Sequence, residues 1–331
     1  MFKNSEKNKI NNKLKFFLIS VLAVYPFFLG INDFQKDLEN ILFQEKVTAY
    51  LIAKASYDLE LEKLKPIKKN QYENLEIDVK SAISFFIKND GSEKILFEKN
   101  KDKSLPIASI AKLMTANIVL KNYQPSHLIK ITPEAINTER SLSNLNVDDT
   151  FLVNDLLHLL LIESSNQAAI ALANEIGMNA FVKLMNFEAK KIGLENTYFF
   201  NPTGLDPDPD FNEKNSQINH STSYDLVKLA RFLLKEKPAI FDISILPQFS
   251  FYSKNGIFYQ TFNTNRLLNL NDFSNIIGGK TGWTIKSQDC LILIIKSPEN
   301  KGIIINVILG ASDRFEEMKK LINWLKISYK W

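Results

Sequence analysis

The order in which strand-like and helix-like patterns follow one another limits the folds open to this chain. Residues 77–87 have the apolar clustering of a strand, Asp90-Gly91 is a turn signal, and residues 95–97 predict the return strand. Helical patterns dominate the middle of the chain, where helices are expected at 111–121, 155–163, 167–176, 180–192 and 224–234.

Strand patterns return in the last third of the chain. Asn255-Gly256, the strongest type of short hairpin-turn signal, lies between expected strands at 249–253 and 257–261. Further strands are expected at 291–296 and 303–309, followed by an amphipathic helix at 314–327. This order predicts an α/β protein of the α+β type, in which helices cover an antiparallel sheet and an all-helical insert interrupts its strands.

Length and composition exclude several classes of protein. A chain of 331 residues is expected to form one large domain or two smaller ones. Hydrophobic residues make up 45% and charged residues 24%, which excludes disorder along the whole length. The net charge of +4 arises from 41 basic and 37 acidic residues, a balance that argues against a nucleic-acid partner.

Residues that commonly bind metals are sparse. The single cysteine, Cys290, excludes a disulfide framework and a cysteine-based zinc site, and we expect it to be buried. His127, His158 and His220 lie far apart, so we expect structural roles for them and no histidine-built metal centre. Asp206 to Asp210 lacks the ligand spacing of a calcium loop and predicts an ordinary loop.

The N-terminus indicates the compartment. Residues 1–15 contain five lysines and precede an uncharged apolar run from Phe16 to Ile31. As a helix this run would span about 24 Å, somewhat less than a hydrocarbon core of about 30 Å. We expect residues 16–32 to be an uncleaved single-pass anchor, with residues 1–15 as a cytoplasmic basic tail and the rest of the chain outside the cell membrane. The alternatives are a cleaved signal peptide, which would give a secreted protein, and a buried core helix.

Two regions are expected beyond this segment. Residues 33–72 predict a helical stalk or linker, because apolar residues recur near the helical period with Glu and Lys between them until Pro66. Residues 73–331 are expected to form the folded domain that carries the chemistry.

The first of three short motifs is Ser109-Ile110-Ala111-Lys112, at the start of an expected helix. Positions i and i+3 share a helix face, so the hydroxyl of Ser109 and the amine of Lys112 can meet. A serine needs an adjacent base to become a nucleophile, and the helix N-terminus and partial burial both lower the pKa of a lysine. Taken alone, this motif is better explained by a capping serine and a solvated lysine.

The second motif is Ser164-Ser165-Asn166, on a connection between two expected helices. The hydroxyl of Ser164 could relay a proton while the amide of Asn166 binds a substrate amide. The alternative is a helix cap, because Ser and Asn are preferred at helix starts. A second Ser-x-Asn match, Ser253-Lys254-Asn255, is already explained by the Asn-Gly turn.

The third motif is Gly278-Gly279-Lys280-Thr281-Gly282. Its spacing is not that of a phosphate-binding loop. Glycines on both sides of Lys280-Thr281 would clear a strand edge, so that a substrate backbone could add as a strand and present its carboxylate to the lysine and the threonine. The alternative is a hairpin turn with a solvated lysine.

The three motifs in this order match the set found in class A β-lactamases and penicillin-binding proteins. The chain resembles the serine D-alanyl-D-alanine carboxypeptidases, the low-molecular-mass penicillin-binding proteins, from about Ser81 to Trp324. The resemblance extends to segments around the motifs at 106–115, 155–169, 201–206, 221–226 and 263–268. It implies a β-lactamase/transpeptidase-like fold and a penicillin-binding DD-peptidase domain at 73–331.

The resemblance also implies catalytic roles. Ser109 would attack the D-Ala-D-Ala peptide bond of a peptidoglycan stem peptide and form an acyl-enzyme, and β-lactams would acylate the same hydroxyl. Lys112 would take and return the proton, and Ser164 would help to shuttle it to the leaving amine. The backbone amides of Ser109 and Trp283 would form the oxyanion hole.

Substrate binding is implied for a second group of residues. Asn166 would hold the substrate backbone and Lys112, while Lys280, Thr281 and Gly282 would form the edge that binds the carboxylate end of the substrate. No metal or organic cofactor is implied.

The chain departs from the family pattern in three respects. Few residues follow Gly282, so we expect the C-terminal β-domain of larger members to be absent and the N-terminal segment to act as the tether. Gln167 stands where Asp is common, and residues 285–289 differ from the usual stretch after the third motif.

Three rival functions remain. A DD-endopeptidase would cut cross-links with the same residues. A class A β-lactamase would need a Glu-x-x-Leu-Asn motif, which is missing between Asn166 and Lys280. A catalytically silent wall-binding homologue would have no physical reason to keep Ser109 and Lys112 paired.

Overall fold

The computed structural model describes residues 3–63, 66–69, 74–138, 144–207 and 217–331. The chain separates into two compact units, Met1–Lys68 with Lys330, and Lys69–Tyr329 with Trp331. The boundary that the sequence predicts between residues 72 and 73, and residues 208–210 of the acidic loop, lie outside the described residues.

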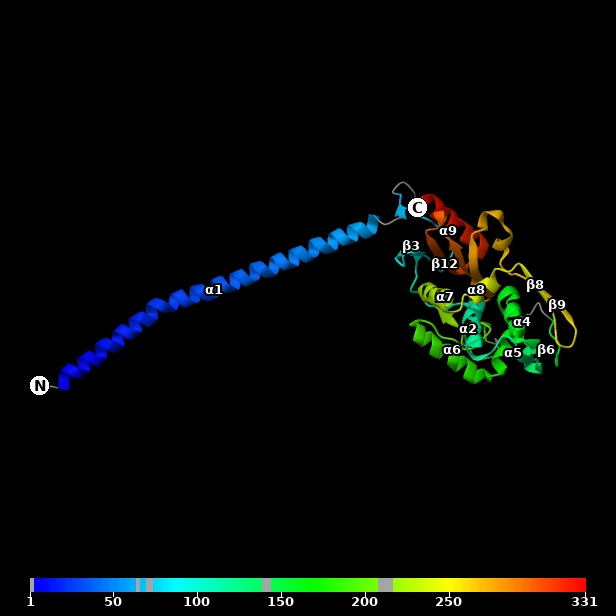
Figure 1. Ribbon diagram of the computed structural model, residues 1–331, viewed down its shortest axis with the longest axis horizontal. Helices are drawn as coiled ribbons and strands as arrows, with labels where there is room; N and C mark the ends of the chain where they lie inside the picture. The colour runs from blue at the N-terminus through cyan, green and yellow to red at the C-terminus, as the bar shows by residue number, and fades with distance from the viewer. Residues whose placement is uncertain (1–2, 64–65, 70–73, 139–143, 208–216) are drawn as a thin grey trace. The chain divides into compact units, whose positions relative to one another are not determined.

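The first unit consists of the long helix α1 (Lys3–Lys63), drawn in blue in Figure 1, and the short strand β1 (Ile67–Lys68). The apolar segment and residues 33–63 of the expected stalk form one continuous helix with Pro26 inside it. Within the described residues, no single helix is both long enough and apolar enough to cross a membrane. Lys15–Val24 is apolar but shorter than a membrane span. The helices Asn166–Asn174 and Met178–Ile192 reach the required length and apolar character only when they are taken together, and they are bent by 99° relative to each other.

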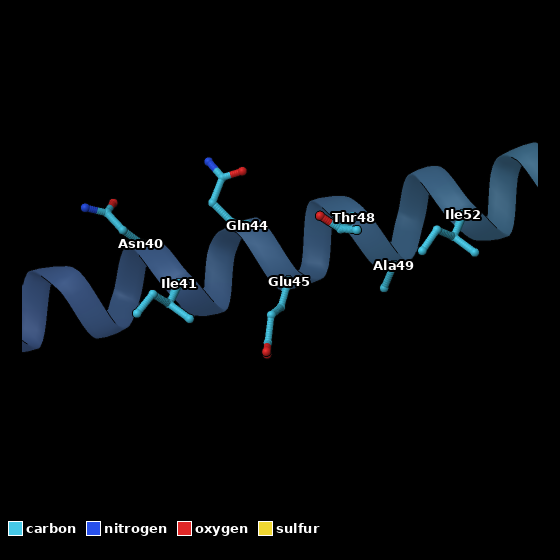
Figure 2. Close-up of a pocket in the computed structure, with 7 residues that line it drawn as sticks. All are labelled: Asn40, Ile41, Gln44, Glu45, Thr48, Ala49 and Ile52. Atoms are coloured by element: carbon cyan, nitrogen blue, oxygen red, sulfur yellow. The ribbon is translucent and has the colours of Figure 1, made fainter.

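The surface of α1 exposes apolar side chains. Figure 2 shows the seven side chains that line a pocket on this helix. Its lining residues are Asn40, Ile41, Gln44, Glu45, Thr48, Ala49 and Ile52. None of these residues belongs to the three sequence motifs.

The second unit is built on a central antiparallel sheet with the strand order β10-β11-β12-β2-β3. Its strands are β2 (Ser81–Lys88), β3 (Glu93–Lys99), β10 (Ile276–Thr284), β11 (Gln288–Lys296) and β12 (Gly302–Ala311). The predicted antiparallel sheet is therefore confirmed. The expected strand at 77–87 begins too early, because Ile77 and Val79 are buried in the core but precede the strand.

Alternate side chains of the sheet strands enter two cores, as the two-residue period of a strand requires. On β11, Ile292 and Ile294 belong to the core shared with the helical insert, whereas Leu291 and Leu293 belong to the core beneath α9 (Arg314–Ser328). Helices α7 (Ser223–Glu236) and α8 (Ala239–Ser244) cover the first face, and Figure 1 shows α9, in red, beside β12.

The predicted helical insert is present between β3 and β10. Its main helices are η1 (Ala108–Ala111), α2 (Lys112–Asn122), α3 (Pro133–Ile136), α4 (Val153–His158), the π-helical segment η2 (Leu159–Glu163), α5 (Asn166–Asn174) and α6 (Met178–Ile192). The Asn255-Gly256 turn joins β8 (Gln248–Tyr252) to β9 (Phe258–Phe262) as predicted. Shorter elements are β4 (Leu105–Pro106), β5 (Leu128–Lys130), β6 (Thr150–Leu152), β7 (His220–Ser221), η4 (Arg266–Asn269), η5 (Asn271–Phe273), η6 (Pro298–Asn300) and β13 (Tyr329–Lys330).

Candidate active site

The first motif lies where η1 passes into α2. Ser109 is half-buried in η1, and Lys112 is the first residue of α2. The Lys112 Nζ donates a hydrogen bond to Ser109 Oγ at 2.8 Å, so the two side chains meet as their spacing predicts. Ala108 has a φ of +47°, a left-handed conformation that is uncommon outside glycine. The backbone is therefore strained immediately before the hydroxyl.

Lys112 is held by two further acceptors. Its Nζ donates to Asn166 Oδ1 and to the Thr203 carbonyl, each at 2.7 Å. Burial lowers the pKa of Lys112 well below its ordinary value, and the nearby charge of Lys280 lowers it further. A neutral amine has two N–H donors, enough for Asn166 and the Thr203 carbonyl, and its lone pair can then accept the Ser109 hydroxyl proton, as general-base activation requires.

The second motif forms the junction between η2 and α5. Ser164 ends the π-helical segment with a φ of +68°, and Asn166 begins α5. Ser165, not Ser164, caps α5, because its side chain accepts a hydrogen bond from Ala168 N. The capping alternative therefore explains Ser165 and leaves the Ser164 hydroxyl available for another role. π-helical segments of this kind often occur at functional sites.

The third motif occupies β10, the strand at one end of the sheet. A Cβ on Gly282 would lie 3.1 Å from Ser109 N and 3.0 Å from the Ile107 carbonyl oxygen. The missing side chain thus allows β10 to approach the backbone of the Ser109 segment closely. The next residue, Trp283, leaves 46% of its surface exposed.

Lys280 is 2% exposed, and its Nζ donates to Ser164 Oγ at 2.8 Å and to the Thr281 carbonyl at 3.0 Å. Burial, and then the charge of Arg314, lowers the pKa of Lys280 to about 7. Lys112 is likewise fully buried. The alternative of solvated lysines is therefore wrong for both motifs.

Thr281 forms a hydroxyl pair with Thr264, with 2.7 Å between the two Oγ1 atoms. Thr264 lies in the segment between β9 and η4 that the sequence associates with the family, but the sequence gives it no specific role. The Thr203 carbonyl is a second contact that the sequence does not reveal, since a backbone acceptor leaves no signal in residue type.

Asp206 connects the segment around Thr203 to the turn after β10. Its Oδ1 accepts a hydrogen bond from Thr284 Oγ1 at 2.9 Å, and its Oδ2 accepts one from Lys286 N at 3.0 Å. Gly204 has a φ of +83°, and a Cβ there would lie 2.0 Å from the Ala108 carbonyl oxygen. Only glycine fits this close approach to the Ser109 segment.

The structure brings the predicted residues together in two hydrogen-bonded groups, Ser109–Lys112–Asn166 and Ser164–Lys280. Gly282 borders the first group through the Ser109 backbone. In the part of the chain that the structure describes, no group of three or more His, Cys, Asp or Glu residues could hold a metal ion. The arrangement places a serine hydroxyl beside two buried lysine amines.

Comparison with known proteins gives a consistent result. The D-alanyl-D-alanine carboxypeptidase family, peptidase S11, matches residues 67–313. A D-alanyl-D-alanine endopeptidase of Pseudomonas aeruginosa is 33% identical over 73% of this chain and 76% of its own length. The D-alanyl-D-alanine carboxypeptidase DacC of Escherichia coli is 32% identical over 73% of this chain and 60% of its own length.

Comparison with solved structures indicates the same family. Penicillin-binding protein D2 of Listeria monocytogenes, in its cefotaxime-bound form, superposes with a TM-score of 0.65 and 28% identity, covering 77% of this chain and all of that protein. The match of the S11 family extends over all three motifs. The chain therefore belongs to the D-alanyl-D-alanine carboxypeptidase family, the S11 family of serine DD-peptidases.

Proposed function

We propose that this protein is a serine DD-carboxypeptidase that removes the terminal D-Ala from peptidoglycan stem peptides through an acyl-enzyme on Ser109. The observation that carries the proposal is the 2.8 Å contact between Ser109 Oγ and the buried amine of Lys112. The sequence match to the family supports the reaction class.

Acylation begins when neutral Lys112 accepts the hydroxyl proton of Ser109. The Ser109 Oγ forms a bond to the carbonyl carbon of the penultimate D-Ala, and the amides of Ser109 and Trp283 stabilise the negative oxygen. Such amide donors are typically worth about 10²–10³ in rate each. The C–N bond then breaks, and the leaving amine takes a proton that Lys112 gives up through Ser164.

Deacylation repeats these steps with water. Lys112 takes a proton from the water, whose oxygen bonds to the acyl carbon, and Ser109 leaves with a proton returned from Lys112. Ser164 is held by Lys280, so its lone pair is engaged and its own proton can point toward the departing group.

Carboxylate capture is assigned to β10. Lys280 is buried and cationic when protonated, and Thr281 supplies a hydroxyl beside it. A substrate chain that adds along the edge of β10 would present its terminal carboxylate to these groups, with Asn166 binding the substrate backbone. Gly282 keeps the edge open.

A DD-endopeptidase is the second candidate, because the Pseudomonas aeruginosa relative that bears this name matches the chain over a larger share of its own length than DacC does. A pentapeptide ending in D-Ala-D-Ala and a cross-linked stem-peptide dimer should be given separately to the purified protein. Faster release of D-Ala from the pentapeptide supports the carboxypeptidase, and faster cleavage of the dimer replaces it with the endopeptidase.

Ser164→Ala tests the proton relay in the same assay. We expect a large loss of D-Ala release, since the leaving amine loses its proton donor. The matched control is Ser253→Ala, which alters the serine of the second Ser-x-Asn match and should leave the rate unchanged. Equal losses in both variants would contradict the relay.

β-Lactams are proposed as inhibitors that acylate Ser109. The cefotaxime-bound relative supports this assignment. Lasting adducts are expected, whereas rapid turnover of a penicillin would favour the β-lactamase alternative.

We further propose that residues 16–32 tether the protein to the cell membrane, with residues 1–15 in the cytoplasm, residues 33–72 as the stalk and residues 73–331 as the catalytic domain outside. Support comes from the basic residues before the apolar run and from the exposure of its side chains on α1, including Phe16 at 77% and Leu22 at 69%.

A further inference from the structure

We propose that Arg314, held by Asp289, is a positioning residue that fixes the Gly282–Trp283 peptide and thereby the oxyanion-binding amide of Trp283. This inference rests on the proposed function, because it concerns the site at which the acyl-enzyme forms. It adds two residues that lie outside the three sequence motifs.

The first observation is a contact with the peptide itself. Arg314 Nη1 donates a hydrogen bond to the Gly282 carbonyl oxygen at 2.5 Å. The C=O of Gly282 and the N–H of Trp283 belong to one planar trans peptide, so they point in opposite directions and turn together. A donor that fixes the carbonyl therefore also fixes the direction of the Trp283 amide.

The second observation is the anchoring of the guanidinium. Asp289 Oδ2 accepts a hydrogen bond from Arg314 N at 3.1 Å, and Asp289 Oδ1 lies 3.5 Å from Arg314 Nη1. Asp289 also stands opposite Trp283 in the pairing of β10 with β11. Both side chains of the ion pair are less than one fifth exposed, at 19% and 18%. One carboxylate thus holds the backbone and the side chain of Arg314 beside the peptide.

The third observation concerns the packing of Gly282. Gly282 packs so closely on the Ser109 segment that a Cβ would come within 3.1 Å of Ser109 N, the second proposed oxyanion donor. The Gly282–Trp283 peptide is therefore bonded by Arg314 and also borders the Ser109 segment. An oxyanion donor accelerates the reaction only if its N–H is already held in the right direction, so a loss of that orientation lowers its contribution to the rate.

Arg314 could also act through its charge, and this electrostatic role can be separated from a positioning role. The charge of Arg314 is the second cause, after burial, of the lowered pKa of Lys280. Arg314→Lys keeps a charge but loses the planar guanidinium, whereas Arg314→Met loses both. A purely electrostatic role would spare the lysine variant, while a positioning role would not.

The test measures β-lactam acylation in the full-length protein, with labelled penicillin over a range of concentrations. This separates the dissociation constant of the initial complex from the first-order acylation rate constant. For Arg314→Lys we expect the rate constant to fall at least about 10-fold, and by less than the 10²–10³ that loss of a whole donor costs, while the dissociation constant stays unchanged. Asp289→Asn should lower the same rate constant, because the guanidinium loses its anchor.

The matched control is Arg266→Met. The Arg266 guanidinium lies over the Phe315 ring at 5.9 Å from its centroid, as that of Arg314 does at 5.3 Å, but among the described residues the guanidinium that bonds the Gly282 carbonyl is that of Arg314. The Arg266→Met variant should acylate at the wild-type rate. Circular dichroism and melting temperature establish that each variant is folded.

Two outcomes would overturn the inference. A wild-type acylation rate constant in folded Arg314→Lys would show that the peptide needs no such support. A raised dissociation constant with an unchanged rate constant would make Arg314 a ligand for the penicillin carboxylate instead. Neither outcome affects the proposed function, which fails only if the wild-type protein is not labelled on Ser109.

Discussion

Lys112 and Lys280 bury their amines in the candidate site and have lowered pKa values mainly for that reason. Their required charges differ. In the proposed mechanism, Lys112 is neutral when it accepts the Ser109 proton, whereas Lys280 is protonated when it attracts a carboxylate. The same physical cause, desolvation, therefore assists one lysine and limits the other.

The pH dependence of kcat/KM follows from this difference. Activity should rise with pH as Lys112 loses its proton, and it should fall as the pH passes about 7, where free-enzyme Lys280 becomes neutral. D-Ala release from the pentapeptide, measured across the neutral and alkaline range, tests this profile. Lys280→Arg stays charged throughout, so residual activity in that variant should lack the falling limb. A falling limb that persists in Lys280→Arg would assign it to another group.

The free energy of unfolding should also depend on pH, because the protonated form of buried Lys280 destabilises the folded protein. The pKa of Lys280 is about 7 in the folded protein and near 10.5 when the chain is unfolded, so the unfolded state binds more protons between these values. The contribution of Lys280 is therefore unfavourable below about pH 7 and is relieved as the pH rises toward 10.5. Lys280→Met should raise the melting temperature at neutral pH, with a smaller gain at alkaline pH. A lowered melting temperature at neutral pH would contradict this account.

The sequence predicts the local contact of the candidate site but not the long-range ones. The i, i+3 spacing correctly brings Ser109 to Lys112, because that contact is local to one helical turn. The Thr203 carbonyl and the Arg314 guanidinium reach the site only through long-range folding. These contacts join segments that are distant in the sequence, and local sequence patterns do not predict which distant segments meet.

Among the elements, β10 approaches the backbone of the Ser109 segment closely at Gly282. Gly282→Ala should separate them, because its Cβ would meet two backbone atoms that cannot move aside alone. We expect the β-lactam acylation rate constant to fall by about 10-fold or more, since the oxyanion geometry is disturbed.

The control for Gly282→Ala is Gly91→Ala, on the β2–β3 turn. Gly91 has a φ of +86° with nothing near a Cβ, so alanine there should cost stability, by about 1–2 kcal/mol, without changing acylation. Stopped-flow labelling and thermal unfolding of both variants separate the two effects. Unchanged acylation in Gly282→Ala would contradict the close-approach argument.

The major helices and strands of the second unit are predictable from sequence, and the short elements are not. The Asn255-Gly256 turn and the amphipathic helix α9 have strong local signals. By contrast, α8, β5 and β6 are short elements with weak periodicity, and they were not predicted. Ile77 and Val79 have strand-like composition, but their burial belongs to the core beneath α9 and not to a strand.

At the scale of the whole molecule, the order of patterns predicts the antiparallel sheet and its helical insert, and the family match covers the same region. The strand order β10-β11-β12-β2-β3 was not predicted, because it requires the first hairpin to pair with the last strand. The sequence likewise does not reveal that the apolar segment and the stalk form one helix.

Membrane association is tested on the whole protein. The full chain should sediment with lipid vesicles, and a variant that lacks residues 1–32 should remain in solution while labelling with penicillin at the full rate. Leu18→Lys with Leu22→Lys provides a control that keeps the chain length and should weaken sedimentation, because charges in an apolar segment are costly in a bilayer. A full chain that does not sediment would contradict the proposed tether.

The most direct test of the central claim is the mass of the intact protein after incubation with benzylpenicillin, followed by peptide mapping. The wild-type protein should gain one penicilloyl group on the peptide that contains Ser109, and Ser109→Ala should gain none while keeping its melting temperature. An adduct that persists in folded Ser109→Ala, or that maps to another peptide, would contradict the account.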